Sequence, residues 1–128
     1  MPYAAQPTTT VGQTLYEFGY VDARFVYVTC SGAVEAQRIG RVLVEERLAA
    51  CVNVLANMAS IYWWQGAVEE AAEAVLIAKT RDNLVPALTE RVKALHSYDV
   101  PGIMVLPIIQ GNPDYLVWIA AETEGAVT

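Results

Sequence analysis

The side chains best suited to bind a transition metal in this sequence are a single histidine and two cysteines, His96, Cys30 and Cys51. Imidazole and thiolate are the donors that soft and borderline divalent ions prefer. One histidine cannot build a tetrahedral site within one chain, and the two cysteines do not form a Cys-x-x-Cys pair. A metal site would need the fold to bring donors together. His96 with Cys30, which directly follows a predicted strand, is the pair we expect.

Each of these residues also has a simpler structural role. His96 follows a predicted helix, and a partial positive charge or a loop hydrogen bond there stabilises the helix end. Cys51 lies between an alanine-rich helix end and an apolar strand, where free cysteines are ordinary core residues. Cys30 would be reactive only beside a positive charge, which the sequence does not reveal. Metal binding and simple packing therefore both stay open for His96 and Cys30.

Three consecutive aromatic residues, Tyr62, Trp63 and Trp64, precede a predicted hairpin turn at Gln65-Gly66. They could stack on a ligand ring, but such residues more often anchor an interface, where they bury a large area. Neighbouring strand residues face opposite sides, so one tryptophan should face the subunit's own helices and the other a partner. We expect these three residues to lie in a subunit interface.

Acidic residues follow the same turn, but motifs for catalysis are absent from the sequence. Glu69, Glu70 and Glu73 could hold a hard cation through oxygen, although negative residues beside a hairpin usually form a solvated edge. There is no phosphate-binding glycine loop, no Ser-His-Asp set and no His-Glu-x-x-His pattern. We therefore expect a binding protein and not an enzyme.

The length and charge of the chain restrict the class of protein. Its 128 residues indicate one domain, and its net charge of −6 argues against binding to nucleic acid or to an anionic membrane surface. Hydrophobic residues make up 55% and charged residues only 17%, so apolar surface is expected in an oligomer interface as well as in the core. No apolar run reaches the length of a membrane span, no basic residue precedes Arg24, and the two thiols look unpaired, which together predict a cytoplasmic protein.

Hydrophobic periodicity predicts the order strand, helix, strand, strand, helix, strand, followed by a last helix. This order favours an α+β fold of the ferredoxin-like kind, a βαββαβ sandwich with helices on one face of an antiparallel sheet, a long central hairpin and a C-terminal helix. We expect a loose arm over residues 1–21, a single domain over 22–123 and a polar tail over 124–128. The predicted strands are Phe25–Thr29, Cys51–Leu55 with Ser60–Gln65 around a bulge, Val68–Thr80 and Ile103–Ile109. The predicted helices are Glu35–Ala50, one capped by Asp82 or Asn83, and one capped by Asn112 with Tyr115, Trp118 and Ile119 on its inner face.

Several long stretches, in order along the chain, resemble the CutA family of divalent-cation tolerance proteins. They are Glu46–Asn53, Ser60–Glu69, Lys79-Thr80, Leu84–Leu88 and His96–Ile119. The resemblance implies a ferredoxin-like subunit and a homotrimer built through long central hairpins, similar to the PII signalling proteins. It also implies a cytoplasmic role in tolerance to copper and other divalent cations.

The resemblance carries over only part of the copper chemistry proposed for some members. Those members place a cysteine in the first strand and two adjacent histidines after the second helix. Here only His96 matches, because Leu95 precedes it and Val28, not Cys30, takes the cysteine position. No cofactor is obligatory on this basis, and copper or another divalent cation is the metal that we expect.

The resemblance also suggests a cleft between subunits. Lys79, Tyr98, Tyr115 and Trp118 come from separate elements and recur in the matching stretches. They could bind an anionic or planar small molecule, or they could simply pack the trimer. Two functions therefore remain: a trimeric metal-tolerance module that binds a cation or regulatory ligand, and a PII-like sensor of a small molecule with no direct metal role.

Overall fold

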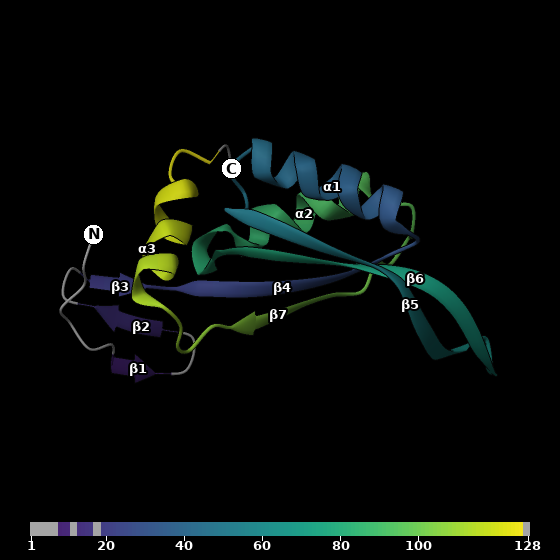
Figure 1. Cartoon of the computed structure of the whole chain (residues 1–128). Coiled ribbons are helices and arrows are strands. Elements are labelled where there is room, and N and C mark those ends of the chain that lie inside the picture. Colours follow the sequence, from purple (N-terminus) through teal and green to yellow (C-terminus); the bar gives the residue numbers. More distant parts are fainter. Residues whose placement is uncertain (1–7, 11–12, 17–18, 127–128) are drawn as a thin grey trace.

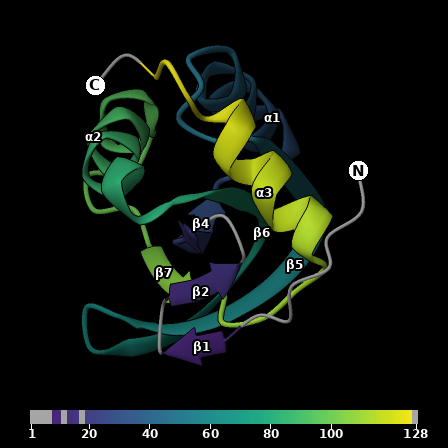
Figure 2. The ribbon, with the colours of Figure 1, turned by 90° about the vertical axis from the view of Figure 1, so that its left-hand side faces the viewer.

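The computed structural model describes residues 8–10, 13–16 and 19–126, with side chains from residue 21 onward. Its centre is an antiparallel sheet with the strand order β5-β6-β4-β7. The strands are β4 (Ala23–Cys30), β5 (Cys51–Trp64), β6 (Ala67–Arg81) and β7 (Ile103–Pro107). Helices α1 (Ala33–Glu45) and α2 (Val85–Leu95) lie on the same face of this sheet (Figure 1, Figure 2). The predicted ferredoxin-like α+β fold is confirmed.

The core lies between the sheet and these two helices. Alternating residues of β4, such as Val26 and Val28, are fully buried against apolar residues of α1 and α2, because strand side chains alternate between faces. Each such side chain contributes roughly 1.5–3 kcal/mol through burial alone. The intervening residues of the four strands face away from both helices, and we call this side of the sheet the open face. It includes Phe25, Tyr27, Cys51, Asn53, Ile77, Lys79, Met104 and Leu106.

Helix α1 is shorter at its C-terminal end than the sequence pattern predicts. The predicted helix extends to Ala50, but the observed one ends at Glu45 and Arg47 adopts a left-handed conformation with φ of 60°. The backbone N–H groups of Leu48 and Ala49 then donate to the carbonyl oxygen of Leu43. These residues are buried in the turn that leads into β5. Their apolar side chains therefore continue the hydrophobic pattern of the helix, although the backbone is no longer helical.

The long hairpin of β5 and β6 confirms two local predictions. The register shifts between Leu55 and Met58, and Asn57 has a φ of 60°, so the expected bulge is present. Gln65 and Gly66 have φ values of 49° and 82°, which is the positive pair that a two-residue type I′ turn requires. The paired strands β5 and β6 continue past this bulge to the tip of the hairpin, which we define as Tyr62–Val68.

The tip projects beyond both helices (Figure 1). Trp63 is 75% exposed and Trp64 is 59% exposed within the single chain. The prediction that one of them packs against the subunit's own helices is therefore wrong, because the helices do not reach the tip. Both indoles, with the half-exposed Tyr62, are left for some other surface to cover.

Capping differs between the last two helices. The predicted side-chain cap on α2 is wrong: a 3-10 turn, Asp82–Leu84, precedes the helix, and no side chain bonds to its first amides. The cap on α3 (Pro113–Glu122) is confirmed, because Oδ1 of Asn112 accepts the backbone N–H of Asp114 at 3.1 Å. Strand β7, which contains Pro107, lies at an edge of the sheet, where a proline is tolerated because it need not donate to a further strand.

Helix α3 covers the end of the sheet where β4 begins and β6 ends (Figure 1). Its buried residues are Leu116 and Ile119, which pack with Ala23 and Ala50. Of the three residues expected on its inner face, Ile119 is buried, whereas Tyr115 and Trp118 are 43% and 40% exposed. The inward prediction is wrong for these two aromatic residues, because Leu116 takes the core position.

The segment expected to be a loose arm contains three short strands, β1 (Thr8–Thr10), β2 (Gln13–Tyr16) and β3 (Gly19–Val21), in a separate antiparallel sheet. Val21 packs into the cluster under α3. The rest of the arm (residues 1–7, 11–12 and 17–18) and residues 127–128 of the tail lie outside the described residues. The boundaries of arm, domain and tail stay predictions. None of the described helices is both long and apolar enough to cross a membrane.

Candidate functional site

The fold brings together the two residues expected to bind metal and adds a third. Cys30 ends β4, His96 follows α2, and Glu35 lies in the first turn of α1. Their potential ligand atoms all lie within 4.8 Å of one another. A thiol, an imidazole and a carboxylate so close together form a plausible donor set for copper or zinc.

The imidazole of His96 is fully engaged in hydrogen bonds. Its side chain is shielded from solvent, its Nδ1 accepts the backbone N–H of Tyr98 at 3.0 Å, and its Nε2 lies 2.7 Å from the carbonyl oxygen of Thr29. Since Nδ1 acts as an acceptor, Nε2 carries the proton and donates to Thr29. The backbone N–H of His96 also bonds to Val92 and closes α2. The structural role expected for His96 is therefore present, and a metal would have to replace one of these ring contacts.

Glu35 joins two loops and is the functional candidate that sequence reasoning missed. Its carboxylate accepts the backbone N–H groups of Ser31 at 3.0 Å and Ser97 at 2.9 Å. Burial would raise its pKa, but the hydrogen bonds from Ser31 and Ser97, with His96 nearby, lower it to about 2. The available signal was an acidic residue in the first turn of the predicted helix that follows Cys30. Its pairing with Ser97 depends on a contact 62 positions away.

Cys30 is fully buried and protonated at neutral pH. Burial, with the negative charges of Glu35 and Glu73, raises the pKa of its thiol to about 11. It is therefore a poor nucleophile, because the thiolate is the reactive form. A bound cation would have to displace the thiol proton, after which Cys30 and Glu35 would supply two negative charges.

A second cluster lies on the open face, at the end covered by α3. Nζ of Lys79 contacts the side-chain oxygen of Asn53 and lies 3.5 Å from Sγ of Cys51. The same sulfur lies 3.5 Å from the hydroxyl group of Tyr115, and this contact together with burial raises the pKa of Tyr115 to about 12. The ring of Tyr115 stacks on Trp118 with centroids 5.5 Å apart. Three of the four predicted cleft residues thus converge. They are joined by Asn53, which sequence reasoning did not single out, and by Cys51, whose expected place in the core is wrong because it is only half-buried on the open face.

Tyr98, the fourth predicted cleft residue, belongs to the other cluster. Its hydroxyl group donates to Glu73 at 2.6 Å, and its ring centroid lies 4.8 Å from that of His96. The bond to Glu73 is the first cause of a raised pKa of Tyr98. Tyr98 therefore links the loop after α2 to the hairpin. Of the three acidic residues considered for a hard cation, Glu73 has this phenol partner, while Glu69 and Glu70 are exposed on the hairpin.

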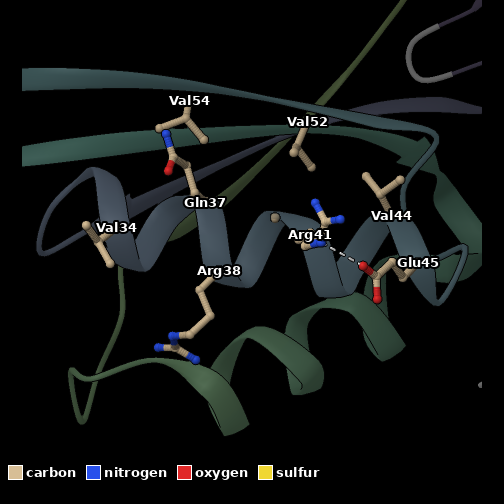
Figure 3. A pocket seen from close by; sticks show the side chains of 9 residues that line it. Val34, Gln37, Arg38, Arg41, Val44, Glu45, Val52 and Val54 are labelled. Atoms are coloured by element: carbon tan, nitrogen blue, oxygen red, sulfur yellow. Dashed lines mark ion pairs between the residues drawn. The ribbon is translucent and has the colours of Figure 1, made fainter.

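An open groove runs between α1 and the edge strand β5 and has a volume of about 810 Å³ (Figure 3). Val34 and Val44 of α1 and Val52 and Val54 of β5 contribute apolar surface. Arg41 lies over the groove but is paired with Glu45 at 2.9 Å. None of the predicted site residues lines it, so the groove does not join either cluster.

Comparison with known proteins relates this arrangement to one family. The family model described as "CutA1 divalent ion tolerance protein" matches residues 24–122, which is most of the chain. The chain belongs to this CutA1 family.

Individual CutA relatives agree with this assignment. Protein CutA of Mus musculus is 46% identical over 120 residues, which are 94% of this chain and 66% of that protein. The divalent-cation tolerance protein CutA of Thermus thermophilus is 50% identical over 98 residues, which are 77% of this chain and 95% of that protein. The chain spans only 55–66% of the lengths of the CutA proteins from mouse, rice and human.

Solved CutA structures share the fold. CutA1 from Oryza sativa has a TM-score of 0.78 at 46% sequence identity, over 80% of this chain and 94% of that one. CutA from Synechococcus elongatus has a TM-score of 0.79 at 28% identity and covers 93% of this chain and 96% of that one. The names of these relatives refer to CutA and, for the Thermus thermophilus protein, to tolerance of divalent cations.

Proposed function

We propose that this CutA1 family chain acts as a cytoplasmic homotrimer that supports tolerance of divalent cations by binding metal, with copper as the first candidate. The observation that carries the proposal is the convergence of Cys30, Glu35 and His96 within 4.8 Å. Thiolate and imidazole donors suit copper and zinc, and the carboxylate adds charge for a divalent ion.

The hydrogen bonds of His96 suggest how metal binding would be sensed. Coordination through Nε2 would break the bond to Thr29 and move the ring proton to Nδ1, where it would face the N–H of Tyr98. Two donors cannot share that contact, so the loop after α2 would have to move. Tyr98 bonds to Glu73 of β6, and the movement would therefore reach the long hairpin. Metal binding would thus be coupled to the surface through which we propose the subunits assemble.

Exposed apolar surface supports the homotrimer. On the open face Met104 and Leu106 are 58% and 48% exposed, and at the hairpin Trp63 and Trp64 are more exposed still. Apolar area of this kind on adjoining elements is typical of a surface that a partner subunit covers. The proposed number of subunits, three, comes from the resemblance to the CutA family. Both cysteines are free, which agrees with a reducing cytoplasm.

A binding titration with matched variants tests the metal proposal. Calorimetry with Cu(II), Zn(II) and, under reducing anaerobic conditions, Cu(I) should show binding that His96→Ala and Cys30→Ala each weaken at least about tenfold. Cys51→Ala removes the other thiol and should leave the affinity unchanged. Equal affinity in all four proteins would mean that metal binds elsewhere. Light scattering of the same samples should give three times the subunit mass of 14.0 kDa.

The second candidate function is a PII-like sensor that binds an anionic or planar small molecule in a cleft between subunits. The observation in its favour is the cluster of Lys79, Tyr115 and Trp118 on the open face. Calorimetry against a panel of nucleotides and organic anions separates this function from the first, because the two clusters share no residue.

A further inference from the structure

Among the side chains of residues 21–126, Lys79 has no acidic partner, whereas the other lysine of the chain has one. Lys79 and Lys93 are the lysines of the sequence, and Nζ of Lys93 lies 3.5 Å from a carboxylate oxygen of Glu90. Nζ of Lys79 forms no ion pair with any carboxylate of residues 21–126; it contacts the amide oxygen of Asn53 and the sulfur of Cys51. Within the described part of the chain, the positive charge of Lys79 on the open face thus contacts neutral groups only.

The surroundings of this charge are partly desolvated. Lys79 is half-buried, and its neighbour in register on β4 is Phe25, which pairs in turn with the apolar Leu106 of β7. A cation removed from part of its hydration and given no counter-charge is costly, so such a position favours an anion. The nearby Tyr115 hydroxyl group and the Asn53 amide can donate further hydrogen bonds to it.

The aromatic stack beside the charge indicates the shape of the anion. The rings of Tyr115 and Trp118 are inclined by 24° with centroids 5.5 Å apart, and both are about 40% exposed. A flat ring is the group that stacks best on an exposed aromatic surface. The cluster contains one ammonium and no arginine fork or glycine-rich loop, so it matches a singly charged carboxylate better than a phosphate.

We infer that Lys79, Asn53, Cys51, Tyr115 and Trp118 form a binding site for a small planar carboxylate. The carboxylate group accepts from Nζ of Lys79 and from the hydroxyl group of Tyr115, and the ring lies against the Tyr115–Trp118 stack. This inference rests on the second candidate function and names its ligand class. The site lies on the face that a partner subunit would cover, so the partner would close it on one side.

Three probes of similar size separate charge from shape. Benzoate has both the carboxylate and the flat ring, cyclohexanecarboxylate keeps the charge without the flat ring, and benzamide keeps the ring without the charge. Calorimetry on the full chain should rank their affinities in that order. We expect Lys79→Met to weaken benzoate binding about tenfold or more, the usual effect of losing a charge-assisted hydrogen bond. Lys93→Met removes a charge of the same kind from α2 and should leave the affinity for benzoate unchanged.

A second measurement does not depend on a variant that folds. Reductive methylation with a ¹³C label gives Lys79 and Lys93 separate methyl signals while keeping their charges. Benzoate should shift the Lys79 signal and leave the Lys93 signal in place. Equal shifts of both signals, or no shift at Lys79, would overturn the inference; the latter is expected if a partner carboxylate neutralises Lys79 in the assembly.

The outcomes also distinguish this inference from the broader functions. If the trimer binds metal through Cys30 and His96 but benzoate does not shift the Lys79 methyl signal, the first proposed function stands and the carboxylate site is excluded. If a nucleotide binds with high affinity and benzoate has no effect, the sensor function stands and a planar carboxylate is excluded as its ligand class.

Discussion

His96 donates a hydrogen bond from Nε2 to the carbonyl oxygen of Thr29 at 2.7 Å, and this bond fixes the loop after α2 to the end of β4. The bond joins residues 67 positions apart, and the side chain of His96 is fully shielded from solvent. It also occupies the atom that would otherwise be the simplest metal ligand. The same imidazole is therefore both a structural element of the fold and the centre of the proposed metal site.

Removing this imidazole should destabilise the chain in the absence of metal. His96→Ala leaves the Thr29 carbonyl oxygen and the Tyr98 N–H without their partner and opens a cavity, so we expect a loss of about 2–3 kcal/mol in the free energy of unfolding. His96→Gln can restore one of the two bonds and should lose less. Urea unfolding with a chelator present measures both variants. Equal losses in the two variants would mean that the hydrogen bond offered by the glutamine of His96→Gln contributes nothing to stability.

Metal affinity should rise with pH if Cys30 is a ligand. The pKa of Cys30 is raised to about 11 by burial and by Glu35, so its thiol must release a proton whenever metal binds at neutral pH. The apparent affinity should increase about tenfold per pH unit, or about a hundredfold from pH 6.5 to 8.5. Competition against a chelator of known pH dependence provides the measurement. Cys30→Ala should abolish this slope, and a slope that persists in that variant would exclude Cys30 as the titrating ligand.

Glu35 should stabilise the fold in a defined pH range. Its pKa is lowered to about 2 in the folded chain, from an ordinary value of 4.5, so the unfolded chain takes up the proton first. The contribution, at most about 3 kcal/mol, is complete above about pH 4.5 and is lost as the pH falls toward 2. Glu35→Gln should thus be destabilised at pH 7, and the difference from the unmodified chain should shrink between pH 4.5 and 3.

The matched control for this prediction is Glu45→Gln. Glu45 is an exposed residue on the same helix, and its ion pair with Arg41 is worth only a few tenths of a kcal/mol. Chemical denaturation of both variants at pH 7, 5 and 3.5 compares them. If the two substitutions have the same small effect at pH 7, the loop hydrogen bonds of Glu35 do not stabilise the fold as proposed.

Both hairpin tryptophans should contribute to assembly. Each is more than half exposed in the single chain, at 75% for Trp63 and 59% for Trp64, so neither belongs to the core of one subunit. Burying one indole in an interface is worth roughly 2–3 kcal/mol per copy. Trp63→Ala and Trp64→Ala should each shift the proposed trimer towards smaller species on dilution and make the melting temperature depend more strongly on concentration.

Analytical ultracentrifugation over a dilution series tests this hairpin prediction. Val34→Ala is a suitable control, because Val34 is 82% exposed and belongs to α1, which is not part of the hairpin. The control should sediment like the unmodified chain. A monodisperse monomer in the unmodified protein at micromolar concentration would contradict the proposed assembly itself.

Gly40 should resist replacement despite its place inside a helix. A Cβ added there would lie 2.8 Å from Cγ2 of Val52 and 3.1 Å from Cδ1 of Leu76, so α1 would have to move away from the sheet. Overpacking of this kind costs about 1–3 kcal/mol and should exceed the gain of about 1 kcal/mol in helix propensity. Thermal unfolding of Gly40→Ala should show a net loss, and adding Val52→Ala should recover part of it. Additive effects of the two changes would mean that they do not touch.

Local sequence signals were sufficient for most of the framework. The β-branched and aromatic strand signal of Phe25–Thr29, the positive-φ turn at Gln65-Gly66 and the Asn112 cap each depend on a few neighbouring residues, and each appears in the structure. The order of the elements then restricted the fold to the ferredoxin-like class, and the motif stretches indicated the family. The proximity of Cys30 to His96, proposed from donor chemistry, also agrees with the fold.

Tertiary contacts decided what local pattern could not. The sequence determined that Leu48–Ala50 and the two hairpin tryptophans are apolar, but apolarity does not distinguish a helix end from a buried turn, or a core from an uncovered surface. Glu35 joined the Cys30–His96 cluster, and Cys51 and Asn53 joined Lys79, because strands and loops distant in sequence lie side by side. Hydrophobic periodicity reports which face of an element is buried, whereas a site depends on which elements meet, and only the packing of the whole chain determines that.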